Sequence, residues 1–136
     1  MVTWLRAHPR GVIAGTALVL GVITWLDYVT GYELGFFIFY FIPVSAAAWL
    51  VGRRVGVAFA LASGACWFLS DRLANHPYSS ALFIYWETTM RLISYLTTAL
   101  TLARIRDDTA ERQRLQAQLE AARQELGRLR RPPSAA

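Results

Sequence analysis

The sequence predicts an all-α protein in which four transmembrane helices form a bundle and continue into a C-terminal cytoplasmic coiled coil. Hydrophobic residues make up 55% of the 136 residues, and they are gathered into four blocks close to the length that a membrane-spanning helix needs, roughly 17–25 residues. Arginines lie between these blocks and after the last one. The final part of the chain is polar, with leucines spaced alternately by three and four residues, as in a coiled coil.

The four predicted spans cover about residues 11–28, 34–51, 55–72 and 81–103. Short segments with turn or charge signals separate them. Pro43 lies inside the second span and is expected to kink it. Small residues recur every fourth position, at Gly11 and Gly15 in the first span and from Gly56 to Gly64 in the third. This spacing predicts close approach of neighbouring helices there.

The placement of arginine predicts how the bundle is oriented. One side of the membrane receives Arg6, Arg10, Arg53, Arg54, Arg104 and Arg106. The other side carries Asp27, Glu33 and Asp71, with Arg72 as its only basic loop residue. Because positively charged loops stay in the cytoplasm, both termini are predicted to be cytoplasmic. We therefore expect a multi-pass protein of the bacterial inner membrane, with the lipid bilayer as one partner.

The C-terminal segment 105–131 is predicted to be a cytoplasmic coiled-coil helix that follows a transmembrane domain over residues 1–104. Its seam consists of Leu115, Leu119, Ala122, Leu126 and Leu129. Such a seam predicts a homo-oligomer, in which dimer, trimer and tetramer all fit. Pro132 and Pro133 end the helix, and residues 132–136 form a tail.

Continued backward, the same register leads into the fourth span. It passes through Arg112, Asp108, Ile105, Thr101, Thr98, Ser94, Arg91 and Glu87. The stripe that is apolar in the coiled coil is therefore polar in the membrane. One interpretation is a helix that relays rotation or sliding to the cytoplasm, since polar seam residues weaken one register and permit others. The other is that the hydroxyl groups bond only to their own backbone carbonyls.

Ionisable residues within the predicted spans point to a binding site near the outer side. Each such residue costs about 2.5–3.5 kcal/mol at the membrane centre and usually marks function. Glu87 and Arg91 stand four residues apart and are expected to form an ion pair. The candidate ligand-binding residues are Asp27, Tyr28, Glu33, Tyr40, Asp71, Tyr78, Glu87 and Arg91. They form either an outward-facing pocket for a small ligand or a structural network, with Tyr40 as pocket floor or as core.

Several function classes receive no support from the residues. We find no catalytic triad motif, no metal-ligand spacing and no phosphate-binding loop, so we expect no enzymatic activity and no metal site. The net charge of +5 comes from arginines at the ends of apolar segments, which does not suit nucleic-acid binding. Cys66 is the only cysteine, which excludes a secreted disulfide-linked fold.

Two alternatives to a ligand sensor stay open. The first is a membrane protein that binds haem b, with His76 as one axial ligand. Because His8 is predicted on the opposite face, the second ligand would come from another side chain or subunit. The second alternative is a small proton-coupled transporter, in which Glu87 would exchange protons and cations.

The run DYVTGYEL at 27–34, followed by FYFIPV at 39–44, resembles a four-helix membrane input region found at the N-termini of bacterial diguanylate cyclases and some sensor histidine kinases. The stretch 76–79 and the pairs 85–86 and 91–92 are also similar, so the resemblance covers about residues 20–106. It implies a four-helix fold and a sensory input role. In those proteins the last span leads into a GGDEF or kinase module. None follows here before residue 136, so we expect either a freestanding relative or a shortened chain.

Overall fold

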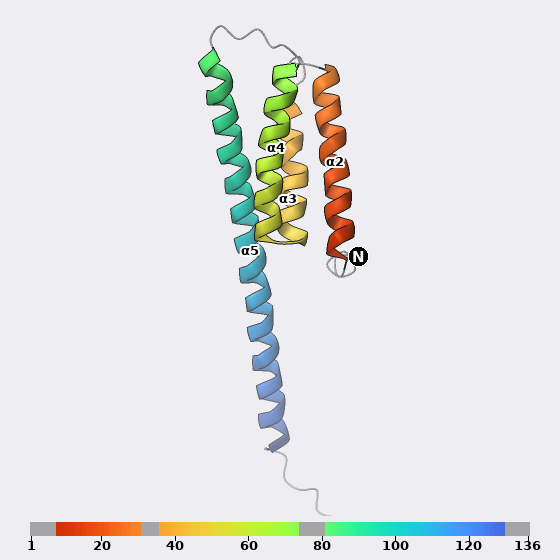
Figure 1. Ribbon diagram of the computed structural model, residues 1–136. Helices are drawn as coiled ribbons and strands as arrows, with labels where there is room; N and C mark the ends of the chain where they lie inside the picture. Colours follow the sequence, from red (N-terminus) through yellow and green to blue (C-terminus); the bar gives the residue numbers. More distant parts are fainter. Residues whose placement is uncertain (1–7, 31–35, 74–80, 130–136) are drawn as a thin grey trace, which may run out of the picture. The chain divides into compact units, whose positions relative to one another are not determined.

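The computed structural model describes residues 8–30, 36–73 and 81–129, and almost all of these residues are helical. The elements are α2 (Pro9–Thr30), the 3-10 helix η2 (Phe36–Tyr40), α3 (Phe41–Leu50), α4 (Arg53–Leu73) and α5 (Ala81–Leu129), drawn in Figure 1. The prediction of an all-α chain is confirmed. The chain divides into two compact units, and the boundary lies between Arg104 and Ile105 within α5.

Pro43 lies close to the point at which the second predicted span changes from a 3-10 helix to an α-helix. Instead of one helix kinked in its middle, the segment forms η2 and then α3, with Pro43 in the first turn of α3. The first backbone N–H groups of an α-helix have no partner inside that helix, so a residue without an N–H loses nothing there. Pro43 therefore lies near the start of a helix rather than in its interior.

The connection between α3 and α4 is a two-residue turn that depends on glycine. Gly52 has a φ of 134°, a backbone conformation that residues with a Cβ rarely adopt. The amides of Val51 and Gly52 both donate to the carbonyl of Ala47, at 3.1 Å each. These bonds satisfy the end of α3, as glycine-terminated helices usually do, and α4 begins at once.

α3 and α4 are the most closely packed pair of helices in the first unit. A Cβ added to Gly56 would lie 2.7 Å from the Cβ of Ala48 and 2.8 Å from its Cα, so only glycine fits. Gly64 plays a milder role against α5, where a Cβ would lie 3.0 Å from Cδ1 of Leu92. The predicted close approach of helices at Gly56 and Gly64 is therefore confirmed.

The same prediction was wrong for Gly11 and Gly15. A Cβ on either residue would meet no atom within 4 Å in the part of the chain that the structure describes. These glycines lie on an exposed face of α2, because α2 packs on its neighbours through Leu20 and Ile23 instead. The buried core of the unit is formed by Leu20, Ile23, Tyr40, Val44, Ala47, Ala48, Phe59, Ala60, Trp67, Tyr95 and Ala99.

Among the described helices, α2 alone has both the length and the hydropathy expected of a membrane span. The apolar helical segment Phe36–Leu50 is too short to meet the same criterion. In α4, the charged residues at its two ends, Arg53, Arg54, Asp71 and Arg72, lower the hydropathy. Membrane crossing by the other three helices is therefore part of our proposal below.

Candidate functional site

Glu87 and Arg91 form the predicted ion pair on α5. Nη1 of Arg91 lies 2.6 Å from Oε2 of Glu87, one helical turn away. The guanidinium group also stacks on Trp67 of α4, 3.8 Å from the ring centroid, and lies 5.2 Å from the ring centroid of Phe37. The Arg91 side chain is 22% exposed and that of Glu87 is 41% exposed. Two aromatic rings thus hold the cation in place, while its carboxylate partner keeps access to the surroundings.

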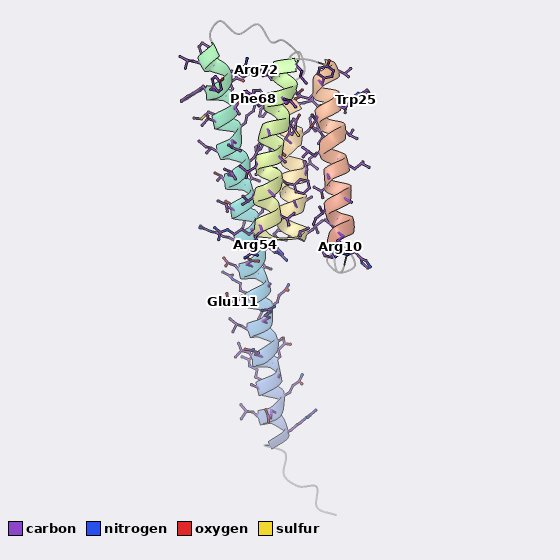
Figure 2. The ribbon with its side chains drawn as sticks, viewed as in Figure 1. Arg10, Trp25, Arg54, Phe68, Arg72 and Glu111 are labelled. Atoms are coloured by element: carbon purple, nitrogen blue, oxygen red, sulfur yellow. The ribbon has the colours of Figure 1, made fainter. Side chains whose placement is uncertain are left out.

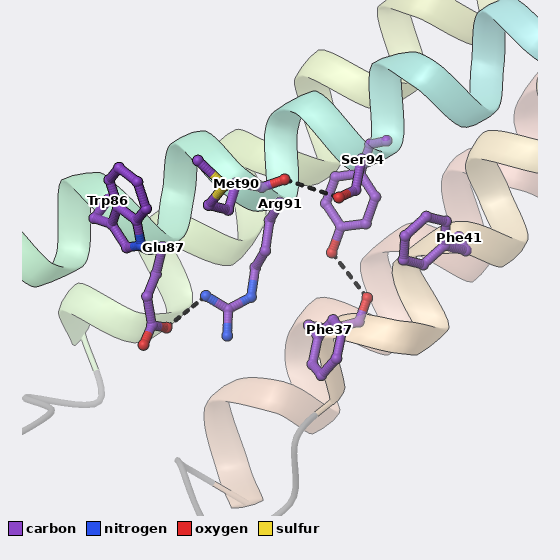
Figure 3. Close-up of a pocket in the computed structure, with 8 residues that line it drawn as sticks. Phe37, Phe41, Trp86, Glu87, Met90, Arg91 and Ser94 are labelled. Atoms are coloured by element: carbon purple, nitrogen blue, oxygen red, sulfur yellow. Dashed lines mark hydrogen bonds and ion pairs between the residues drawn. The ribbon is translucent and has the colours of Figure 1, made fainter.

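A cavity of about 290 Å³ lies beside this ion pair. It is lined by Phe37, Phe41, Trp86, Glu87, Met90, Arg91, Ser94 and Tyr95, shown in Figure 3. The lining therefore comes from η2, α3 and α5. Most of it is aromatic or aliphatic, and the charged groups that line it are the two members of the ion pair. Ligand sites typically have this composition, with an apolar wall and a few polar groups that orient the ligand.

Tyr95 connects two walls of the cavity. Its hydroxyl donates to the backbone carbonyl of Phe37 at 2.8 Å. Its ring meets the ring of Phe41 edge to face, with centroids 4.8 Å apart and planes at 73°. Buried tyrosines usually combine an apolar ring contact with one hydrogen bond in this way. Tyr95 therefore holds α5 against η2 and α3 at the edge of the cavity.

Arg91 has hydrogen-bonding capacity that its described neighbours do not use. Its Nε is buried and has no hydrogen-bond partner among the residues that the structure describes. A buried donor without a partner is costly, by about 1–3 kcal/mol. The guanidinium group thus has one side engaged by Glu87, while its buried Nε has no partner among the described residues.

Asp27 and Tyr40 form a second, separate polar pair inside the bundle. The Tyr40 hydroxyl donates to Oδ2 of Asp27 at 3.1 Å. Tyr40 is fully buried and Asp27 is buried as well. The two residues link η2 to α2, and neither lines the cavity beside Arg91. The predicted cluster is therefore divided, with Tyr40 in the buried core, bonded to Asp27 and outside this cavity.

The other candidate residues are more scattered. Tyr28 is half exposed at the end of α2. Asp71 is partly buried near the end of α4, and its Oδ2 has no hydrogen-bond partner among the described residues. Its neighbour Arg72 lies over the ring of Phe68, and its Nη2 donates to the hydroxyl of Tyr85 at 3.4 Å. Glu33, His76 and Tyr78 lie outside the described residues, so their predicted roles stay predictions.

Trp67, Tyr95 and Phe37 are the site residues that sequence reasoning missed. Trp67 follows Gly64 by three residues and so continues the small-residue face of α4, which was a usable signal. Tyr95 follows Arg91 by four residues on α5, which was a second signal. The position of Phe37 carries no such signal, because it depends on how η2 meets α5. Trp86, in the first part of α5, also lines the cavity.

The hydroxyl groups of α5 bond within their own helix. Ser94 donates to the carbonyl of Met90 and Thr98 donates to that of Ser94, both at 2.9 Å. Thr88 donates to Ile84 in the same way. These bonds favour the local interpretation of the polar stripe, in which the hydroxyl groups need no partner on another helix.

No group of three residues with metal-ligating side chains occurs in the described ranges. No protein-family model, curated protein or solved structure matches this chain. The arguments that follow therefore rest on the residues and their geometry alone.

Proposed function

We propose that the chain is a homo-oligomeric, four-span membrane sensor that passes a change at the Glu87–Arg91 cavity to a coiled coil. The observation that carries this proposal is that one helix, α5, contains both the ion pair and the leucine seam. A ligand that alters the ion pair acts on the same helix that joins the subunits. The proposed activity is signal input without catalysis.

The outer surface of the first unit supports membrane insertion. Large apolar side chains are exposed on each of its helices, among them Leu18, Trp25, Ile42, Leu61, Leu69, Leu82 and Ile93. In water so much exposed apolar surface would drive aggregation, whereas in a bilayer it contacts lipid tails. This surface argument extends the membrane assignment from α2 to η2, α3, α4 and the first part of α5.

The charges at the two ends of the bundle support the proposed orientation. Figure 2 places Arg10 and Arg54 at one end and Arg72 at the other, close to the level of Trp25. The end with more arginines would face the cytoplasm by the positive-inside rule. Both termini would then lie inside, and the chain would be a multi-pass protein of the bacterial inner membrane.

The leucine seam supports self-association. Leu115 is 52% exposed, and Leu119 and Leu126 are each 61% exposed. Ala122 is exposed between them, on a helix that shows no other apolar face in this region. Burying one leucine side chain stabilises an assembly by about 1.5–3 kcal/mol, so seams of two or more copies gain by packing together.

The sequence resemblance to the input regions of diguanylate cyclases and sensor histidine kinases supports the same proposal. In those regions the last span continues as a helix toward an output module, and α5 continues here for 49 residues as one helix. The partner of the coiled coil would be a second copy of this chain. The haem and transporter alternatives stay predictions, and no contact of the described residues favours either.

Disulfide crosslinking tests the proposal in membranes. A cysteine placed at the seam, Leu119→Cys in a Cys66→Ser background, should crosslink between subunits, while Ala117→Cys on the opposite face should not. We expect Glu87→Ala and Arg91→Ala each to change the extent of crosslinking at Leu119→Cys by about fivefold or more, because coupling energies between sites are typically 1–3 kcal/mol. Arg72→Ala, outside the cavity, serves as the matched control.

Two outcomes would count against the proposal. Equal crosslinking at the seam and on the opposite face would contradict the coiled coil. Equal crosslinking of the seam in the wild type, Glu87→Ala and Arg91→Ala would contradict a coupling between the ion pair and the coiled coil.

A further inference from the structure

We infer that the cavity beside Arg91 binds a small carboxylate with an apolar body, and that this carboxylate takes the place of Glu87 on Arg91. The inference rests on the proposed function, because it names the ligand class of the same cavity. Three features of the cavity carry it: its size, the chemistry of its walls and the unequal freedom of the two charged residues.

The size of the cavity limits the ligand. Its volume is about 290 Å³, near the lower end of the range for small-molecule sites, roughly 300–1,000 Å³. At about 30 Å³ for each water-sized unit, the space holds roughly ten non-hydrogen atoms. A carboxylic acid with a short alkyl chain or a single aromatic ring has this size.

The walls of the cavity determine the character of the ligand body. Phe37, Phe41, Trp86 and Met90 present rings and a thioether to the space. A ligand made of polar groups throughout would leave those groups without partners against these walls, which is costly. The body of the ligand is therefore apolar, and its polar group must lie at the ion pair.

Arg91 is the fixed member of the ion pair and offers the donors. Trp67 and Phe37 hold its guanidinium group, and its buried Nε has no partner among the described residues. A guanidinium group binds a carboxylate most strongly through two parallel hydrogen bonds. The Arg91 side chain is 22% exposed and lines the cavity, so an incoming carboxylate can reach the guanidinium group there. Figure 3 shows the guanidinium group between Glu87 and Phe37.

Glu87 is the member that can leave. Its side chain is 41% exposed, and the bond to Arg91 joins residues of one helix, so releasing it breaks no contact between helices. Exchange of one carboxylate for another keeps Arg91 paired, while the released Glu87 carboxylate adds one negative charge beside the cavity. Because the Glu87 side chain is 41% exposed, this charge can turn toward the surroundings instead of staying buried and unpaired.

A cationic ligand fits the same cavity less well. It would need Glu87 as its partner and ring faces for cation–π contacts. The rings of Trp67 and Phe37 already make cation–π contacts with the Arg91 guanidinium group. A second cation would be repelled by Arg91 at short range. The arrangement therefore favours an anion.

Binding is measured on the full chain in nanodiscs of zwitterionic phospholipid, by titration calorimetry. Octanoate is the probe, and 1-octanol and octylammonium are matched in length but neutral or positively charged. We expect saturable binding of octanoate and at least about tenfold weaker binding of the other two, because only the carboxylate pairs with Arg91. A second acid, 3-phenylpropanoate, partitions less into lipid. Stronger binding of this acid would indicate a ligand taken from water, and stronger binding of octanoate a ligand taken from the bilayer.

Substitution of the two charged residues is expected to change the affinity for octanoate in opposite directions. Arg91→Gln should weaken octanoate binding at least about tenfold, since the charge-assisted bonds are lost. Glu87→Gln should strengthen it by about threefold or more, because the competing carboxylate is gone. Arg72→Gln, a cation outside the cavity, should leave the affinity unchanged. Unchanged affinity in Arg91→Gln, weaker binding in Glu87→Gln, or preferential binding of octylammonium would overturn the inference.

Failure of this inference and failure of the relay are distinguishable. The crosslinking comparison of Glu87→Ala and Arg91→Ala uses no added ligand, so its result does not depend on the ligand class. Octanoate binding with unaltered crosslinking overturns only the relay. Altered crosslinking without octanoate binding overturns only the ligand class.

Discussion

The Tyr40 hydroxyl donates a hydrogen bond to the buried carboxylate of Asp27 in the first unit. It reaches Oδ2 of Asp27 over 3.1 Å, and Tyr40 itself is fully buried. We expect Tyr40→Phe to lower the free energy of unfolding by about 1–3 kcal/mol, because Asp27 would lose a partner where water does not replace it. Thermal unfolding in detergent would measure the loss.

The control for this prediction is Tyr28→Phe. Tyr28 is half exposed at the end of α2, so its hydroxyl is accessible and its removal should change the melting temperature little. Equal stability of Tyr40→Phe and the wild type would show that the Asp27 bond does not contribute.

At the residue scale, sequence reasoning found the parts of the site that belong to one helix. The spacing of Glu87 and Arg91 predicted their ion pair, because residues four apart share a helical face. Sequence reasoning also placed Asp27 and Tyr40 in the same cluster as Glu87 and Arg91, although Asp27 and Tyr40 bond to each other inside the bundle. Which side chains meet across helices depends on helix rotation, and periodicity alone does not determine it.

At the element scale, replacing the glycines of α4 with alanine is expected to lower stability by different amounts. Gly56→Ala places a Cβ 2.7 Å from the Cβ of Ala48 and 2.8 Å from its backbone Cα. The two helices must move apart, so we expect a loss of about 1–3 kcal/mol in stability. Gly64→Ala meets only the tip of the Leu92 side chain, at 3.0 Å, and should cost less than about 1 kcal/mol because that tip can shift.

Gly21→Ala is the matched control for this series. A Cβ at Gly21 would meet nothing within 4 Å, and alanine favours a helix over glycine by about 0.5–1 kcal/mol. The expected order of melting temperatures is Gly21→Ala highest, then Gly64→Ala, then Gly56→Ala. If Gly56→Ala were as stable as Gly21→Ala, the packing of α3 on α4 would be wrong.

The positions of the helices followed from the sequence more closely than their internal geometry did. α4 begins at Arg53 and ends at Leu73, close to the predicted span over residues 55–72. Charged and turn residues mark such ends, so they can be recognised locally. The division of the second segment into η2 and α3 was not predicted, since a proline is compatible with both a kinked helix and a new helix start.

At the scale of the whole molecule, the proposed orientation is tested by accessibility. Arg54→Cys and Arg72→Cys, each in a Cys66→Ser background, place thiols at opposite ends of the bundle. Both positions are exposed. In intact spheroplasts we expect a membrane-impermeant maleimide to label Arg72→Cys and to label Arg54→Cys only after permeabilisation, because arginine-rich ends stay in the cytoplasm.

The reverse labelling pattern would invert the bundle and place the seam outside the cell. Equal labelling of both positions before permeabilisation would contradict membrane crossing by α4. Leu119→Cys reports separately on the side of the membrane that the seam occupies.

The walls of the cavity differ in how firmly they are held. The wall made by η2 and α3 is anchored, since only Val51 and Gly52 separate α3 from α4 and the Cα of Ala48 leaves no space over Gly56. α5 is held to this anchored wall by side chains, and one of these contacts is the hydrogen bond from the Tyr95 hydroxyl to the carbonyl of Phe37. We therefore expect ligand entry to move α5 away from the α3–α4 hairpin, which stays in place. The rate at which the Tyr95 bond breaks would then limit the rate of ligand binding.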